Sequence, residues 1–256
     1  MRVLAWRSRR GLLLALLLQC LPAAAGGTET RAYAVISLVG DVLTVVGEQN
    51  TTGTHLRSNQ RESISLPSLE LDRLVIGQVT RAVAQADSGS RLLPVLLTDP
   101  RHYAAQGGWI SGERANLPAD LLAALRGAGA THLIAVLKYR DHARIRTAHE
   151  IKGSGHLEGL GFYLDYETRV RRVGEGEVAT GFIAPYVYMR LALVDLTSGG
   201  VVRSRPSMAA TAISASGTSA RGADPWNILG DGAKIREIGR MLELQLADAL
   251  PAVLER

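Results

Sequence analysis

Cysteine is almost missing from this sequence. The chain has 256 residues and one cysteine, Cys20, which lies within the first 25 positions. If those positions are removed, the rest of the chain has no thiol, so we expect no disulfide, no thiolate metal ligand and no cysteine nucleophile. Packing alone must then hold the fold together, and roughly 230 residues can bury enough surface for that.

Long apolar runs are equally scarce, and the most pronounced one lies at the amino terminus. Four arginines occupy the first ten positions, a leucine-rich run follows over residues 11–18, and Pro22 precedes three alanines that end at Ala25. This pattern is typical of a secretory signal peptide over residues 1–25, cleaved near Ala25. A membrane span needs about 20 apolar residues, and Gln19 interrupts this run. Lipidation at Cys20 is not expected, because Leu18-Gln19 stand just ahead of it where a lipoprotein signal has small residues. We predict a periplasmic or secreted protein.

An excess of one charge is also lacking once the leader is set aside. The formal net charge of the whole chain is +5. Residues 1–25 hold four arginines and no acidic residue, so 25 basic and 24 acidic side chains remain after them. A nearly neutral body has no general attraction for phosphate backbones, and a nucleic acid is therefore not expected as a partner.

Aromatic residues make up only 5% of the chain, and they are unevenly distributed. Both phenylalanines and four of the seven tyrosines fall in one segment: Phe162, Tyr163, Tyr166, Phe182, Tyr186 and Tyr188. One interpretation is a local core, in which aromatic pairs across strands stabilise the segment. The other is an amphipathic surface for a protein, glycan or membrane partner. We predict these six as candidate partner-binding residues.

Patterns that carry catalysis are not found. The six histidines show no metal-protease spacing, and although a fold could gather His142, His149 and His156 around one metal, scattered surface histidines are the simpler interpretation. Ser111 stands one place too late for a nucleophile elbow, and residues 230–234 lack the spacing of a phosphate-binding loop. We predict a non-catalytic protein with no catalytic residue, metal or cofactor.

Two alternatives remain open at this point. The first is a hydrolase or lyase of envelope polymers that uses Asp165, Glu167 or His156; Asp165 and Glu167 share a face if their strand is regular, and Arg169 and Arg171 continue it. The second is a peripheral membrane-associated protein.

Hydrophobic periodicity predicts the elements of an α/β (α+β) fold. Residues 33–39 and 42–46, separated by Gly40-Asp41, are typical of a β-hairpin. A helix with an apolar stripe is predicted from an N-cap at Ser68 to Ala86. A strand over 91–98 contains Pro94, which favours a sheet edge. We expect a loop over 99–116, then a helix opened by Pro118 and a central strand over 131–139.

The pattern changes after residue 140. Residues 153–205 show strand-like runs and turn glycines without a helical stripe, which indicates an antiparallel meander. A last helix is expected after Gly230-Asp231-Gly232. We therefore predict a single domain over residues 26–256, with a mixed sheet, two or three packing helices and the aromatic-rich meander as an extension.

Residues 68–250 resemble a group of bacterial envelope domains. In these a helix leads through a Gly-Ala turn into a central strand, as in residues 127–136, and a later strand ends in an Asp-x-x-Ser-Gly turn, as in VDLTSGG over 194–200. The group includes the peptidoglycan-synthase-activating lipoproteins, the curli secretion lipoprotein and the amino-terminal domain of the Tol periplasmic protein; the chain is also similar to uncharacterised secreted proteins of proteobacteria. The resemblance implies an accessory protein that binds an envelope protein or glycan polymer and is not an enzyme.

Overall fold

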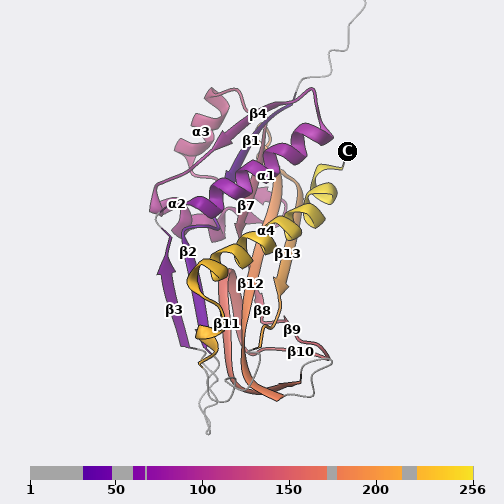
Figure 1. Cartoon of the computed structure of the whole chain (residues 1–256). Helices are drawn as coiled ribbons and strands as arrows, with labels where there is room; N and C mark the ends of the chain where they lie inside the picture. The colour runs from indigo at the N-terminus through magenta and orange to yellow at the C-terminus, as the bar shows by residue number, and fades with distance from the viewer. Residues whose placement is uncertain (1–30, 48–59, 67, 172–177, 215–223, 256) are drawn as a thin grey trace, which may run out of the picture.

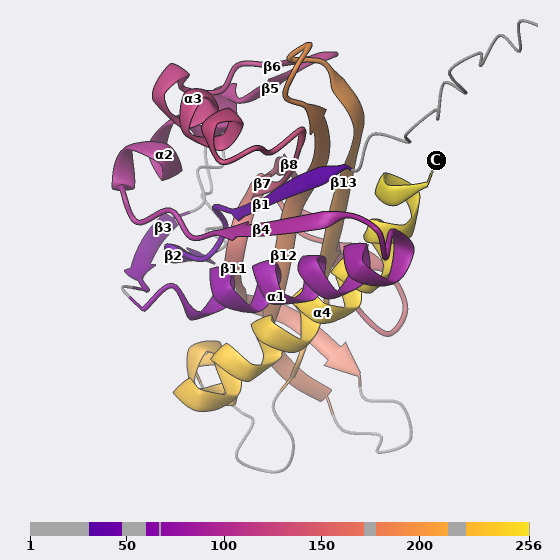
Figure 2. The ribbon, with the colours of Figure 1, turned by 90° about the horizontal axis from the view of Figure 1, so that it is seen from above.

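The structure is a computed structural model that describes residues 31–47, 60–66, 68–171, 178–214 and 224–255. Over these ranges the chain forms the predicted α+β fold, a mixed sheet with helices on both faces (Figures 1 and 2). The described helices are α1 (Glu70–Ala86), α2 (Pro100–Ala105), α3 (Ala119–Gly127) and α4 (Asp231–Leu254), with short 3-10 turns η1 (Gln106–Gly108) and η3 (Pro225–Ile228).

The main sheet has nine strands among the described residues, and they form two tiers joined by one long strand, β12 (Val178–Asp195). The upper tier in Figure 1 consists of β4 (Arg91–Val95), β1 (Ala32–Ser37) and β7 (His132–Lys138). The lower tier consists of β3 (Gln60–Ser65), β2 (Val42–Gly47) and β11 (His156–Arg171), with β8 (Arg140–His142) also paired to β11.

Both tiers lie on the same edge of β12. Residues 189–195 of β12 pair with β7, and its residues 178–188 pair with β11. The opposite edge of β12 pairs with β13 (Val201–Ala210), whose partners on β12 run from Tyr186 to Val194 and so span the two tiers. The predicted antiparallel meander is therefore confirmed: β11, β12 and β13 follow one another in the chain and pair as antiparallel neighbours within the main sheet.

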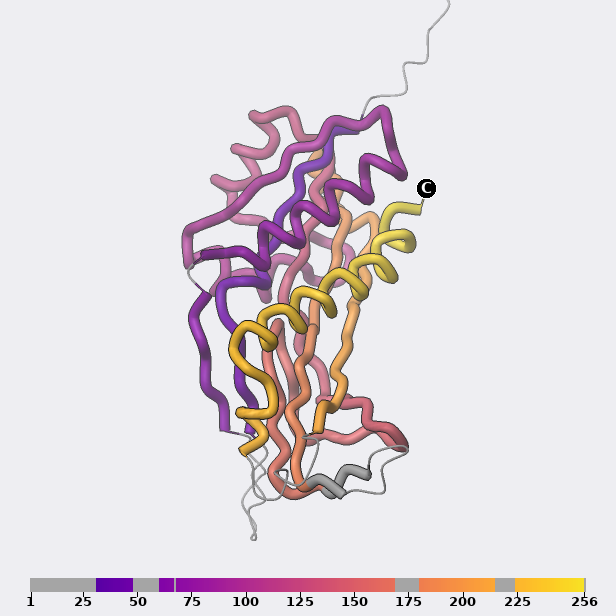
Figure 3. Tube along the Cα trace, in the orientation of Figure 1, coloured from indigo at the N-terminus to yellow at the C-terminus, as the bar shows by residue number. Residues whose placement is uncertain are grey.

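The predicted hairpin of residues 33–46 is wrong. β1 is parallel to both β4 and β7, whereas β2 is parallel to β11 and antiparallel to β3. Because β7 and β11 are both antiparallel to β12, β1 and β2 run in the same direction, one after the other. All six residues of β1 are buried, which fits a strand flanked by parallel neighbours and covered on both faces. The segment over 38–41, which contains Gly40 and Asp41, joins β1 to β2, and the indigo part of the trace in Figure 3 runs on from the upper tier into the lower one.

Two local expectations also need correction. Ser68 does not cap the first helix: α1 begins at Glu70, and the residue before it is Leu69 in the left-handed conformation, with φ 51°. The segment expected as a loop over 99–116 contains α2, η1 and the small hairpin β5 (Ile110–Ser111) and β6 (Arg114–Ala115). Asp99 is the N-cap of α2, because its carboxylate accepts a hydrogen bond from the backbone N–H of Arg101. Hydrogen bonds from the side chain and backbone of Arg101 lower the pKa of Asp99 to about 2.

Other expectations are confirmed. β7 lies between β12 and β1, and β4, which contains Pro94, ends the upper tier. The apolar stripe of α1 is buried at Leu71, Val75, Val79 and Val83. Among the described residues, none of the helices has the length and hydrophobicity needed to span a membrane.

Each face of the sheet has its own cover. α1 and α4 pack on one face of both tiers, and α2 and α3 lie on the other face of the upper tier (Figure 2). In the lower tier, that second face is covered by residues 143–155, which include the small hairpin β9 (Ile145–Arg146) and β10 (Ile151–Lys152).

Candidate functional site

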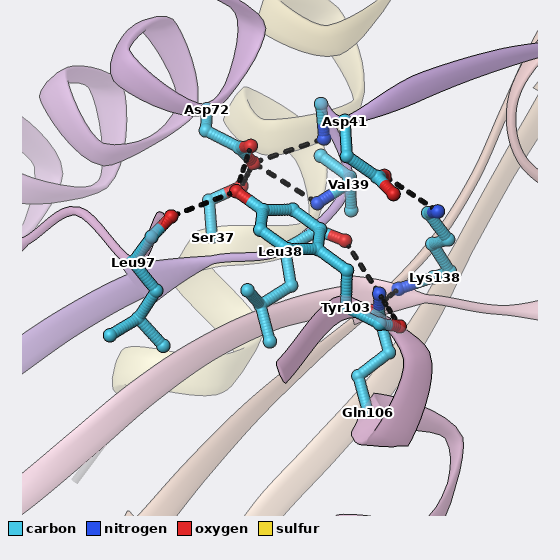
Figure 4. Close-up of polar contacts among 10 residues, drawn as sticks. Ser37, Leu38, Val39, Asp41, Asp72, Leu97, Tyr103, Gln106 and Lys138 are labelled. Atoms are coloured by element: carbon cyan, nitrogen blue, oxygen red, sulfur yellow. Dashed lines mark hydrogen bonds and ion pairs between the residues drawn. The ribbon is translucent and has the colours of Figure 1, made fainter. Parts of the chain in front are cut away.

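The point where the chain passes between the tiers is held by a buried carboxylate. Asp72 lies in the first turn of α1 and is fully buried, whereas the sequence suggested an ordinary acidic residue near a helix start. Its Oδ1 atom accepts hydrogen bonds from Ser37 Oγ at 2.5 Å and from two backbone N–H groups, of Val39 at 3.0 Å and Gly40 at 3.1 Å (Figure 4). Its Oδ2 atom accepts one from the Tyr103 hydroxyl at 2.8 Å.

Gln106 extends this network towards the lower tier. Its amide nitrogen donates to the carbonyls of Leu38 and Tyr103, at 2.8 and 3.0 Å, and its Oε1 accepts from the backbone N–H of Lys138 at 2.8 Å. Lys138 in turn forms a partly buried ion pair with Asp41, with Nζ and Oδ1 separated by 2.6 Å. The end of β1, the start of α1 and the α2–η1 segment are thus connected by polar contacts (Figure 4).

The chemistry of this network is structural. Burial raises the pKa of Asp72, and the four hydrogen bonds that it accepts oppose that rise. Burial and the neighbouring carboxylate also raise the pKa of the Tyr103 hydroxyl. Because both Asp72 oxygens already accept hydrogen bonds in the interior, the group fixes the crossover between tiers and is not presented to a reactant.

The predicted aromatic residues occupy different places in the structure. Phe162 packs against η3, with its ring centroid 5.6 Å from that of Trp226, and belongs to the core cluster on the face that α1 and α4 cover. The opposite faces of β11 and β12 bring three tyrosines and Phe182 into the core beneath residues 143–155. Five of the six side chains are at most 1% exposed, whereas Tyr166 is 48% exposed. Five of the predicted partner-binding residues are therefore core residues: Phe162, Tyr163, Phe182, Tyr186 and Tyr188. For Tyr166, which is exposed, partner binding stays a prediction.

The buried hydroxyls of this cluster bind backbone groups. Tyr186 donates to the carbonyl of Thr44 at 3.1 Å, which joins β12 to β2 across β11. Tyr188 accepts from the N–H of Arg144 at 3.0 Å and donates to the carbonyl of His142 at 3.1 Å. These bonds attach residues 142–144 to the sheet, so the cluster holds the segment that covers it.

Asp165, one of the carboxylates of the hydrolase alternative, is bound within its own strand. Asp165 is buried and accepts hydrogen bonds from the N–H groups of Glu167 and Thr168 and from the Thr168 hydroxyl, at 2.8, 2.7 and 2.6 Å. The register of β11 against β12 shifts between Asp165 and Arg169, so the regular alternation that would put acids and arginines on one face is broken. Asp165 stabilises this irregularity in the strand.

The histidines are brought together only in part. His142 on β8 lies opposite His156 on β11, with ring centroids 4.4 Å apart, whereas His149 is exposed in the turn between β9 and β10. Among the described residues, no group of three or more His, Cys, Asp or Glu side chains is placed to hold a metal ion.

A groove lies between the β9–β10 hairpin, the end of β13 and the middle of α4. Its volume is about 400 Å³. Ile151 on the hairpin and Leu244 on α4 contribute large apolar side chains that are 69% and 54% exposed. The described residues that line it include three arginines and no acidic residue: Arg144, Arg146 and Arg240. We call this the arginine groove.

Local structure fixes the arginines of the groove. Ala143 and Ile145 are buried, and Arg144 and Arg146 alternate with them, so both arginines project from the same face of this segment. The backbone carbonyl of Arg146 accepts from Ala212 N–H at 2.9 Å, which ties the hairpin to the end of β13. The alternation in residues 143–146 was the available sequence signal, and sequence reasoning missed it because it did not assign strands there.

The charge of the groove is only partly neutralised. Arg240 forms an ion pair with Glu237, one turn earlier on α4, with nitrogen–oxygen distances of 3.0 and 2.5 Å. This contact raises the pKa of Arg240 and lowers that of Glu237. Within the described part of the chain, no ion pair involves Arg144 or Arg146.

Of the comparisons with known proteins, the one with solved structures found similar chains. No protein-family model matches the sequence, and no curated protein matches it. One similar structure is the PelC dodecamer from Paraburkholderia phytofirmans, with 11% identity, a TM-score of 0.34 and coverage of 88% of each chain. Another is a putative neuraminyllactose-binding hemagglutinin homolog from Helicobacter pylori, with 8% identity, a TM-score of 0.39 and coverage of 89% of this chain and 87% of that one.

Two further solved structures are also similar to this chain. The LpoB C-terminal domain from Salmonella enterica has 12% identity and a TM-score of 0.22, and the match covers 72% of this chain and 86% of that one. Lipoprotein GNA1162 from Neisseria meningitidis has 8% identity and a TM-score of 0.28, with coverage of 86% and 99%.

Proposed function

We propose that this chain is an exported accessory protein of the bacterial cell envelope that acts by binding another molecule at the arginine groove. Two exposed aliphatic side chains, Ile151 and Leu244, line the same groove as Arg144 and Arg146, and this single observation carries the proposal. Neither arginine forms an ion pair with another described residue. Exposed apolar side chains with nearby arginines are the composition of binding surfaces. The arginine-rich and leucine-rich leader supports export.

The proposal assigns the buried groups a supporting role. Asp72, Asp165 and the aromatic cluster have their polar atoms bonded within the fold, and they hold the sheet and the β9–β10 hairpin in place. The groove is thereby built on fixed elements, which reduces the entropy that a partner must overcome on binding.

Site-specific photo-crosslinking in a proteobacterial host tests this function. A photoreactive amino acid replaces Leu244 in the groove, and in a control strain it replaces Val202, which is 51% exposed on β13 and does not line the groove. We expect cell fractionation to find the chain outside the cytoplasm without its leader, and position 244 to give an adduct of defined mass that position 202 does not give. Intact Met1 on cytoplasmic protein, or identical adducts at both positions, would contradict the proposal.

A further inference from the structure

We infer that the ligand of the arginine groove is an acidic peptide segment in which carboxylate side chains alternate with aliphatic ones. This inference rests on the proposed function and specifies the chemistry of the partner. Two features meet in one concavity: a positive charge that Glu237 neutralises only in part, and an apolar rim.

The positive charge favours carboxylates. A guanidinium presents a planar fork of N–H donors that matches a carboxylate in a two-bond arrangement. Arg144 and Arg146 lie two residues apart on one extended segment, so an extended peptide running beside it would bring every second side chain near them. Arg240 lines the same groove from α4, although its ion pair with Glu237 neutralises part of its charge.

The apolar rim favours a peptide over the other anionic partners. Ile151 and Leu244 belong to two different walls of the groove, so they can enclose an aliphatic side chain between them. A membrane surface would instead be met by apolar residues on a convex face. A glycan would be expected to stack on aromatic rings, and none of the described residues that line this groove is aromatic. The groove volume of about 400 Å³ suits a few side chains.

The test measures binding of a defined probe to the purified mature protein by isothermal titration calorimetry at low ionic strength. The probe is an acetylated and amidated hexapeptide in which aspartate and leucine alternate, and the control peptide has asparagine in place of aspartate. We expect the aspartate peptide to bind and the asparagine peptide to bind at least about tenfold more weakly, with affinity that falls as salt is added.

Matched variants locate the site. Arg146→Glu should weaken binding of the aspartate peptide at least about tenfold, whereas Arg114→Glu, which makes the same charge change at an exposed residue of β6 outside the groove, should change it less than about twofold. Ile151→Ser should weaken binding about threefold or more, because it removes an apolar contact without a change in charge. Circular dichroism of each variant confirms that it is folded.

The outcomes separate this inference from the proposed function. If phosphatidylglycerol vesicles bind the protein through Arg146 and the peptide does not, the peptide inference is overturned while binding at the groove stands. Equal binding of the two peptides, or equal effects of the variants at positions 146 and 114, would also overturn it. A crosslinked adduct at position 244 that resists protease digestion would refute the peptide and retain the function.

Discussion

The carboxylate of Asp72 provides the sharpest test of how the two tiers are joined. Asp72→Ala would leave the N–H groups of Val39 and Gly40 without their acceptor in the interior, and each buried unpaired donor costs about 1–3 kcal/mol. Tyr103 would keep a second acceptor, the Leu97 carbonyl at 3.1 Å. Relief from burying a charge offsets part of the loss, so we expect the free energy of unfolding to fall by about 2–4 kcal/mol.

Urea denaturation followed by circular dichroism measures this change, with an unchanged m-value as the sign that stability alone has altered. Asp72→Asn is the matched control, because its remaining Oδ1 can still accept from the two backbone groups while the charge is lost. It should cost about 1–2 kcal/mol. If Asp72→Ala were as stable as the unchanged protein, the carboxylate would not be holding the crossover.

The difference in stability between the unchanged protein and Asp72→Asn should depend on pH. Burial raises the folded pKa of Asp72 above its ordinary value of 3.8, so the folded state holds this proton more tightly than the unfolded state does. The stability contributed by this group therefore falls as pH rises from 3.8 through the folded pKa. Asparagine does not titrate, so the advantage of the unchanged protein over Asp72→Asn should be larger near pH 4 than near pH 7. A difference that grows with pH would refute this.

Three further changes probe the strands and turns. Gly161→Ala would put a Cβ atom 1.9 Å from the carbonyl oxygen of Thr44, so it should lower the free energy of unfolding by at least about 3 kcal/mol. The control Gly47→Ala, whose Cβ atom would meet nothing within 4 Å, should change that free energy by less than about 1 kcal/mol. Urea denaturation measures both. Tyr188→Phe removes two hydrogen bonds to backbone groups and should cost about 1–3 kcal/mol by the same assay; a neutral effect would contradict the role of that hydroxyl. The pKa of Asp195 is lowered chiefly by the N–H of Thr197, so the stability that this carboxylate contributes is present above pH 3.8 and is lost as pH falls through the folded pKa. In thermal melts across that pH range, Asp195→Asn should abolish this pH-dependent part of the stability, which amounts to less than about 1 kcal/mol.

Periodicity was sufficient to predict the elements that bury one stripe or both faces. The three- and four-residue spacing of α1 and the apolar run of β7 reflect local geometry, because the same side chains that form the pattern make the core contacts. The antiparallel strands around the aromatic segment were predictable for the same reason. Their aromatic composition did not distinguish a core from a surface, since cross-strand aromatic pairs serve in both.

The placement of β1 and β2 was not predictable from local sequence. Gly40-Asp41 between two apolar runs is the signature of a tight turn, yet here it is a passage between two strands that run in the same direction. The choice is made by strands that appear about a hundred residues later. Gly40 is needed there because a Cβ atom would lie 2.7 Å from the backbone nitrogen of Asp72.

The candidate site was outside the reach of a motif search. The arginine groove combines residues 144–151 with residues 208–211 and 240–245, and no short pattern joins them. A weaker signal was present in the alternation of small or apolar residues with arginine over 143–146. Its reading as a strand with one basic face would have predicted Arg144 and Arg146 as surface residues, although not what faces them across the groove.

The dependence of both tiers on β12 dictates the order in which the chain can mature during synthesis. The backbone N–H of Ala32 donates to the hydroxyl of Thr131, 99 positions away. The inner edges of the two tiers, on β7 and β11, are paired only when residues 178–195 have been made. Until then the newly made strands have uncovered edges, and pairing at such sequence separation is slow. A polypeptide that stops short of β12 would therefore not yield a smaller stable protein; its open edges would instead recruit one another and precipitate.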